Sequence, residues 1–156
     1  MKIHSLLILD KSGVCVYNRN FTETFQNLDV NLITPFLSAL FSFSEKTLSR
    51  NLDELEMSGL RFMFSMMEDF VFVLVADTSV NLIFGDSRLE EIMQIFYDYS
   101  KQGDFSGIQQ IDDEEFDDKI DAIISGQEEL FKNKKFFEKV IDLFKGQIWE
   151  NEIAAA

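Results

Sequence analysis

The stretch that most constrains the fold is residues 70–76, whose sequence FVFVLVA is apolar at every position. A short run of β-branched and aromatic residues is typical of a β-strand. Neighbouring side chains of a strand point to opposite faces of the sheet, so a strand that is apolar throughout needs cover on both faces. The sequence therefore predicts a central strand in a sheet that is covered on both sides.

Two apolar runs at the start of the chain predict a hairpin. Residues 3–9 and 14–17 have the composition of strands, and the sequence DKSG at residues 10–13 separates them. This tetrapeptide fits a β-turn in which the Asp10 carboxylate accepts hydrogen bonds from turn amides and Gly13 takes the position that favours glycine. We therefore expect the first two strands to pair with each other.

A second pair of strands is predicted at residues 52–58 and 60–67, around Gly59, and Glu68 and Asp69 are expected to form the tight turn into residues 70–76. Residues 60–67 alternate between two faces. One face carries Leu60, Phe62, Phe64 and Met66, and the other carries Arg61, Met63 and Ser65.

Helical periodicity predicts a first helix from about Asn31 to Ser49, with Thr34 as an internal start because the following proline is tolerated in a first turn. The sequence SRLE at residues 87–90 has the form of a capping box and predicts the start of a second helix. Residues 103–107 contain two glycines and interrupt that helix, and residues 112–125 and 127–149 are predicted as two later helices. The predicted order is β-β-α-β-β-β-α-α with an extra helix at the C-terminus.

Neither an internal repeat nor a low-complexity linker divides the sequence. It therefore predicts one domain at residues 1–125 and a C-terminal helical extension at residues 126–153. Residues 154–156 are three alanines, which we interpret as a tag or a frayed end.

The charge of the chain disfavours several classes of partner. Its 28 acidic residues against 14 Lys and Arg give a formal net charge of −14, which repels nucleic acid and acidic membrane surfaces. The sequence begins without the features of a secretory signal, and no apolar run approaches the roughly 18 residues that span a bilayer. We expect a cytoplasmic protein that does not insert into membranes and reaches them, if at all, through partners.

Most catalytic and metal-binding motifs are absent from the sequence. One histidine and one cysteine exclude a zinc site of the Cys/His type and an intrachain disulfide. His4 lies at the start of a predicted strand without a glycine-rich elbow nearby, and no phosphate-cradling loop is present. We therefore predict no catalytic residue, no cofactor and no metal, and we interpret Cys15 as a small core residue.

Residues 111–118 have the sequence IDDEEFDD, but the glycine and glutamate that an EF-hand requires at its sixth and twelfth positions are absent. Acidic residues favour a helix N-terminus because they complement the helix dipole. The acidic stretch Asp112 to Asp118 is therefore either a solvated helix start or a docking strip for a basic partner.

The 17 phenylalanines include Phe36, Phe41 and Phe43 on the first predicted helix. One stripe on that helix contains Ile33, Phe36, Leu37, Leu40, Ser44 and Leu48, and Phe41 and Phe43 make it wider than a helix on a sheet needs. Either further elements cover the helix or its outer edge binds a partner. We take Phe36, Phe41 and Phe43 as candidate partner-binding residues. The segment around Trp149 has two similar interpretations: it either packs on its own domain or forms an interface with a partner.

The opening sequence IHSLLILDKSGVCVY, the following helix and the strand pair LRFMFSMMEDFVFVLVAD resemble the longin (SNARE-like) domain family over about residues 2–102. The likeness is greatest to the small longin-type subunits of TRAPP tethering complexes. The residues that match their N-terminal pattern are Ile3, His4, Leu6, Asp10, Gly13 and Cys15. Roadblock domains have a related sheet but begin with a helix.

This resemblance implies a five-stranded antiparallel sheet with the first helix on one face and the later helices on the other. It also implies a non-catalytic role, because longin domains pair with one another or present a platform to small GTPases and trafficking proteins. The chain lacks the heptad segment and membrane anchor of longin SNAREs, and its acidic stretch and extra helix depart from the TRAPP subunits.

The predicted function is a cytosolic longin-type interaction module that dimerises or joins a complex and binds or regulates a small Ras-like GTPase in membrane-trafficking-type processes. Its expected partners are another longin-type chain and a small GTPase. One alternative is a purely structural, adaptor-like subunit without GTPase contact. Another is an enzyme with a pocket between helix and sheet, for which the sequence offers no convergent polar groups.

Overall fold

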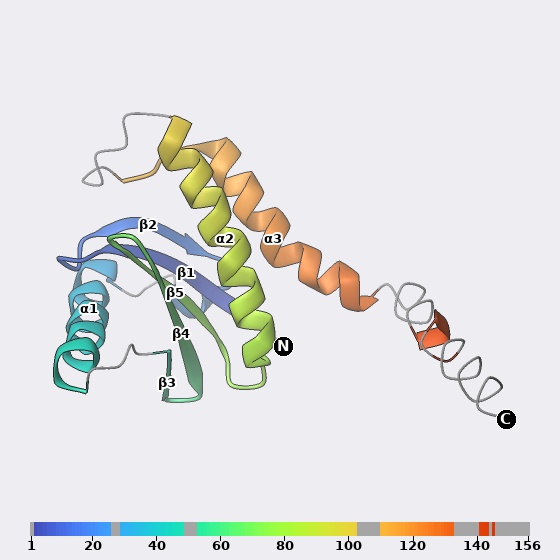
Figure 1. Cartoon of the computed structure of the whole chain (residues 1–156), viewed down its shortest axis with the longest axis horizontal. Helices are drawn as coiled ribbons and strands as arrows, with labels where there is room; N and C mark the ends of the chain where they lie inside the picture. The colour runs from blue at the N-terminus through green and yellow to red at the C-terminus, as the bar shows by residue number, and fades with distance from the viewer. Residues whose placement is uncertain are drawn as a thin grey trace, which may run out of the picture. The chain divides into compact units, whose positions relative to one another are not determined.

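The structure is a computed structural model that describes residues 2–25, 29–48, 53–102, 110–132, 141–143 and 145. The chain divides into two compact units, Met1–Ile120 and Asp121–Ala156. The first unit contains all the strands described below. Figure 1 shows the elements in chain order.

Five antiparallel strands form one sheet in the order β2-β1-β5-β4-β3. Their bounds are Ile3–Asp10 for β1, Cys15–Asn20 for β2, Glu54–Met57 for β3, Leu60–Met67 for β4 and Phe70–Asp77 for β5. The first and fifth strands lie side by side in the middle of the sheet, where Ile8 pairs with Phe72. The predicted five-stranded antiparallel sheet is thus confirmed.

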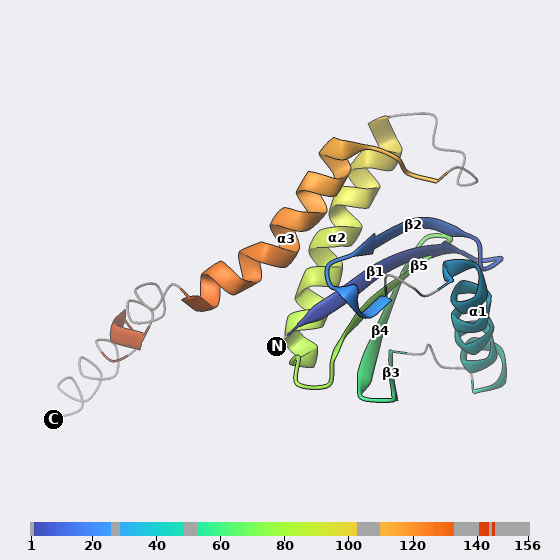
Figure 2. The same ribbon diagram turned by 180° about the vertical axis from the view of Figure 1, so that it is seen from behind.

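The helices lie on both faces of this sheet, as predicted (Figure 1, Figure 2). Helix α1 spans Val30–Thr47 and covers one face; α2 spans Leu82–Gln102 and covers the other, as does the start of α3, which spans Glu114–Lys132. A short 3-10 helix, η1, spans Glu23–Phe25 between β2 and α1.

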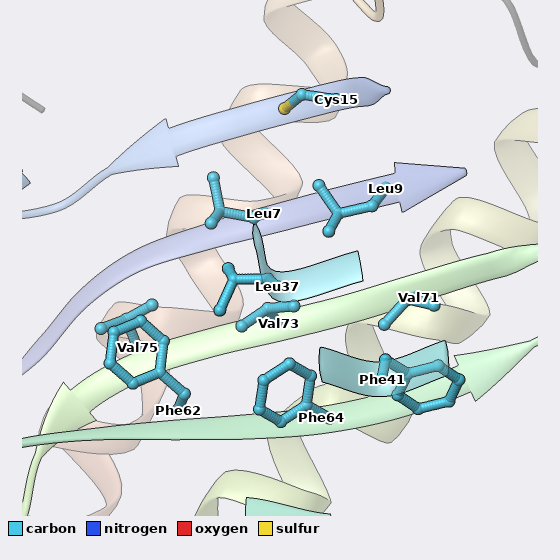
Figure 3. Close-up of a cluster of buried hydrophobic side chains, with 10 residues drawn as sticks. All are labelled: Leu7, Leu9, Cys15, Leu37, Phe41, Phe62, Phe64, Val71, Val73 and Val75. Atoms are coloured by element: carbon cyan, nitrogen blue, oxygen red, sulfur yellow. The ribbon is translucent and has the colours of Figure 1, made fainter. Parts of the chain in front are cut away.

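The core between α1 and the sheet is purely apolar at its centre (Figure 3). Helix α1 contributes Leu37 and Phe41, which pack on inward-facing residues of β1, β2, β4 and β5. The sheet residues in this cluster are Leu7, Leu9, Cys15, Phe62, Phe64, Val71, Val73 and Val75. Phe62 and Phe64 share this face as the alternation of residues 60–67 predicts.

The core on the opposite face is built around α2. The ring of Phe72 on β5 meets the ring of Phe96 on α2 edge to face, with centroids 5.3 Å apart. Met63 on β4 is fully buried, and a Cβ atom added at Gly85 of α2 would lie 2.1 Å from its sulfur. Residues 71–76 of β5 are all buried, so the predicted cover on both faces is confirmed.

The turn between β1 and β2 has the predicted chemistry and also positions α1. Asp10 Oδ1 accepts hydrogen bonds from the backbone N–H of Ser12 at 2.9 Å and of Val14 at 3.0 Å. Gly13 has φ of +87°, and a Cβ atom there would lie 3.1 Å from Cβ of Ser38 on α1. Glycine at this position therefore allows both the turn and the close approach of the helix.

The expected start of α2 at Ser87 is wrong. The helix begins at Leu82, after Asn81, whose side-chain oxygen accepts a hydrogen bond from the Ile83 N–H at 2.9 Å. Arg88, which the capping-box interpretation placed in a first turn, lies inside the helix and is buried.

The expected break between residues 125 and 127 is also wrong, because α3 continues through Gly126. The predicted break at residues 103–107 lies outside the described residues. Of the predicted last helix, residues 127–132 belong to α3 and residues 141–143 are helical, while Trp149 lies outside the described residues. The predicted domain boundary at residues 125 and 126 stays a prediction.

Candidate interaction surface on α1

Helix α1 begins at Val30, within one residue of the predicted start at about Asn31, because Asp29 caps it. The Asp29 side chain accepts a hydrogen bond from the backbone N–H of Asn31 at 2.9 Å. Pro35 therefore lies inside the helix and does not mark its start. The hydroxyl of Thr34 donates to the carbonyl of Val30 at 2.9 Å, within the first turn of the helix.

One side of α1 is buried against the sheet. Its buried residues are Thr34, Leu37, Phe41 and Ser44, which follow one another at three and four positions and so share one side of a helix. The ring of Phe41 stacks on that of Phe64 with centroids 6.5 Å apart, and Phe41 is only 4% exposed. The expectation that Phe41 lies on an exposed outer edge is therefore wrong, since its ring belongs to the core.

The other two candidate residues are exposed, and they belong to a second apolar stripe. Leu32 is 75% exposed, Phe36 49% and Phe43 59%, and Ala39 between them is exposed as well. We call Leu32, Phe36, Ala39 and Phe43 the outer stripe. At 3.6 residues per turn it lies about 150° around the helix from the buried stripe. It is therefore a separate apolar surface, and not the rim of the core.

The outer stripe is free of charge although the chain is strongly acidic. No charged residue occurs between residues 30 and 44, and the nearest charged residues are Asp29 before the helix and Glu45 and Lys46 near its end. Large exposed apolar side chains that follow one another on one helix face are typical of a surface that binds another protein. The geometry thus supports Phe36 and Phe43 as candidate contact residues.

A network of polar side chains around the buried His4 is a second arrangement whose groups are of the kind that take part in catalysis. Asp77 Oδ1 at the end of β5 lies 2.6 Å from Nε2 of His4, and Oγ1 of Thr22 lies 2.7 Å from Nδ1. The hydrogen bond with His4 lowers the pKa of Asp77 below its ordinary value. His4 is only 5% exposed and both of its ring nitrogens are engaged within the protein, so the ring is not presented to a substrate.

The acidic stretch is partly used by the fold itself. Asp113 caps α3 by accepting a hydrogen bond from the Glu115 N–H at 2.9 Å. Asp117 accepts a hydrogen bond from the Tyr17 hydroxyl at 2.6 Å and lies 3.3 Å from Arg19. Within the described residues, no three histidine, cysteine or carboxylate side chains are placed to hold a metal ion. The arrangement supports the interpretation of this stretch as a helix start.

In the parts of the chain that the structure describes, no helix is long and apolar enough to cross a membrane.

Comparisons with known proteins give weak structural likenesses. No protein-family model matches the sequence, and no curated protein matches it. Among solved structures, gliding protein MglB of Thermus thermophilus aligns with 14% identity and a TM-score of 0.44, over 51% of this chain and 64% of that one. MglB of Myxococcus xanthus aligns with 15% identity and a TM-score of 0.43, over 51% of this chain and 68% of that one.

A Roadblock/LC7 domain from Streptomyces avermitilis aligns with 10% identity and a TM-score of 0.40, over 52% of this chain and 71% of that one. The chain thus spans less than two thirds of the length of the Thermus protein.

Proposed function

We propose that this chain is a non-catalytic, longin-type interaction module that pairs with another longin-type chain or joins a larger complex. In that role it binds or regulates a small Ras-like GTPase in processes of the membrane-trafficking kind. It acts in the cytoplasm and reaches membranes only through its partners. The observation that carries the proposal is the outer stripe, an uncharged apolar surface on the side of α1 that faces away from the core.

The polar clusters of the described residues favour a binding role over catalysis, because each of them stabilises the fold. His4 joins β1, β5 and the segment after β2. Arg61 on β4 pairs with Glu54 and Glu56 of the neighbouring strand β3, at 2.7 Å in each case. These groups lock strand ends and strand pairs together, which provides a rigid support for α1.

The charge of the chain indicates how a second partner would be attracted. A formal net charge of −14 produces a negative field around the molecule, which steers a basic surface towards it and repels acidic ones. In this proposal the apolar contact on α1 holds the pair or complex together, the assembled form binds the GTPase, and the field increases the rate of association with a basic partner.

A direct test is the binding of purified Ras-like GTPases, each loaded with a fluorescent GDP or GTP analogue. We expect saturable binding of at least one GTPase to the wild-type chain, and a loss of at least tenfold in affinity for Phe43→Ser. Ile83→Ser is the matched control, because Ile83 is 78% exposed but lies on α2. It should leave binding unchanged.

Two outcomes would contradict the GTPase part of the proposal: no binding across the set, or equal binding by the wild type and Phe43→Ser. If GTPase binding is absent but Phe43→Ser still disrupts assembly with another chain, the purely structural, adaptor-like role is the better description. Nucleotide exchange and hydrolysis rates measured in the same samples would show whether a bound GTPase is also regulated.

A further inference from the structure

We infer that the outer stripe is self-complementary and binds a second copy of this chain, with the two α1 helices antiparallel about a two-fold axis. In this arrangement Leu32 meets Phe43 of the second copy, and Phe36 meets Ala39 of the second copy. The inference rests on the proposed function in that both treat the outer stripe as an interface, and it adds the identity of the partner and the register of the contact.

The spacing of the stripe fits a two-fold pair. Its members are separated by four, three and four residues, a pattern that reads identically in both directions. A two-fold axis perpendicular to the helix, midway between residues 37 and 38, therefore brings every member of the stripe opposite another member. In a two-fold interface between identical copies, a residue that contacts a second residue of the partner copy is matched by the reverse contact, and this spacing allows that for every member of the stripe.

The sizes of the side chains are complementary in that register. At the centre, the large Phe36 lies opposite the small Ala39, and the same contact is repeated by symmetry. At each end, Leu32 lies opposite Phe43. Helices pack closely when large side chains of one fit beside small ones of the other, so a small residue at the centre allows the helix axes to approach.

Charged residues at the ends of the helix are also placed favourably in that register. The register that matches the stripe also brings Asp29 to the level of Lys46 of the second copy, at both ends of the helix pair. The antiparallel arrangement sets the N-terminal end of each helix dipole beside the C-terminal end of the other. No charged residue between 30 and 44 opposes the contact, so like charges do not meet at its centre.

The net charge distinguishes this occupant from a basic partner. Two copies that each carry −14 repel one another at long range, so salt should strengthen their association by screening. A basic partner would be attracted at long range, and salt should weaken its binding. The sign of the salt dependence therefore identifies the kind of partner on the stripe.

The test combines molar mass and cross-linking on the full chain. Sedimentation equilibrium should show a dimer whose dissociation constant falls as salt is raised. Phe36→Ser and Phe43→Ser should raise that constant at least tenfold with an unchanged circular dichroism spectrum. Ile83→Ser should leave it unaltered. These three positions are exposed, so the variants are expected to fold.

Cysteine variants test the register. In the proposed pair, Ala39→Cys lies about 4.5 Å along the axis from its own copy, and Leu32→Cys lies about 16 Å from its own copy. A short bismaleimide should therefore link Ala39→Cys and fail to link Leu32→Cys. The native Cys15 is buried and should not interfere.

Several results would overturn the inference. A wild-type chain that stays monomeric at all concentrations and salt levels rules out a second copy, while a GTPase whose binding depends on Phe43 would still support the proposed function. A dimer that links through Leu32→Cys, as a parallel pair would, contradicts the register. A dimer insensitive to both serine variants places the contact elsewhere on the molecule.

Discussion

Asp77 Oδ1 lies 2.6 Å from Nε2 of His4, so the last residue of β5 is tied to the second residue of β1. The other ring nitrogen of His4 lies 2.7 Å from Oγ1 of Thr22, and the His4 carbonyl accepts a hydrogen bond from the Phe21 N–H at 2.8 Å. One buried histidine therefore joins the two central strands to the segment that leaves β2.

This contact should make the protein sensitive to acid. The hydrogen bond with His4 lowers the pKa of Asp77 in the folded state, so ionised Asp77 contributes stability above its unfolded pKa. That contribution is lost as the pH falls through the lowered folded value. Urea unfolding at a series of acidic pH values should show a decline in the free energy of unfolding that is shallower in Asp77→Asn.

Replacing Asp77 by alanine should do more harm, because it leaves Nε2 of the buried His4 without this partner. We expect a loss of about 1–3 kcal/mol near neutral pH, the usual cost of an unsatisfied buried polar group. If the free energy of unfolding declines with falling pH in the same way in the wild type and in Asp77→Asn, the protonation of Asp77 is not linked to folding.

Phe41 and Phe43 form a matched pair with opposite environments. Phe41→Ala should reduce the free energy of unfolding by about 3–5 kcal/mol, since it empties part of the core beside Phe64. Phe43→Ala removes an exposed ring and should change the stability of the monomer by about 0.5 kcal/mol or less, measured at a concentration at which the chain is monomeric. Equal losses in denaturant unfolding would show that both rings are buried in solution.

Gly85 and Gly126 form a second matched pair, both within helices. Gly85→Ala should destabilise the protein by about 1–3 kcal/mol, because the new methyl group would overlap the sulfur of the fully buried Met63. Gly126→Ala has open space around its Cβ position and should gain up to about 1 kcal/mol from helix propensity.

Combining Gly85→Ala with Met63→Ala provides the check on this steric explanation. The double variant should be more stable than the sum of the two single losses implies, because the methyl group added at residue 85 occupies part of the space that the shortened side chain at residue 63 leaves. Additive losses in thermal or urea unfolding would mean that Gly85 matters for a reason other than its contact with Met63.

The thiol of Cys15 should be unreactive in the folded protein. Burial raises its pKa to about 11, partly offset by the hydrogen bond that the thiol donates to the Tyr17 carbonyl. At about pH 8.5, where an ordinary thiol is half ionised, little thiolate is present to react. A maleimide should label the protein only after denaturation, and rapid labelling of the native chain would place Cys15 at the surface.

The sheet could be predicted from the sequence because its signals are local. Alternation in residues 60–67 assigned both faces correctly, and the DKSG sequence at residues 10–13 gave the turn with Asp10 as acceptor. The approximate places of the strands followed from short apolar runs separated by turn residues, which depend little on distant parts of the chain. The second strand differs, because β2 spans Cys15–Asn20 and its polar residues 18–20, beyond the predicted residues 14–17, still pair with β1.

The two sides of α1 could not be separated in this way. Thr34 completes the buried stripe with Leu37, Phe41 and Ser44, and a search for apolar spacing does not find a polar residue such as Thr34. Apolar spacing alone therefore places the exposed Phe36 in one stripe with the buried Leu37, and it does not separate the buried Phe41 from the exposed Phe43. The two sides of α1 can be told apart only once the structure shows which of them contacts the sheet.

Contacts between distant residues account for the other differences. Residues 82–86 contain Gly85, which lowers helix propensity, and the glycine is present because α2 approaches Met63 closely. The capping-box pattern at residues 87–90 then gave a start that is too late. The network around His4 joins residues 4, 22 and 77, which are far apart in the sequence, so no local motif predicts it.

The place of β1 between β2 and β5 has a consequence for how the protein is made. The hairpin of β1 and β2 can form as soon as it leaves the ribosome. The other edge of β1 pairs with β5, where Leu7 lies opposite Val73, so this edge stays unpaired until β5 emerges. Until then a strongly apolar strand edge stays open to other chains. Slowing translation before residues 70–77 have emerged from the ribosome should therefore increase aggregation of the nascent chain, whereas slowing it after they have emerged should not.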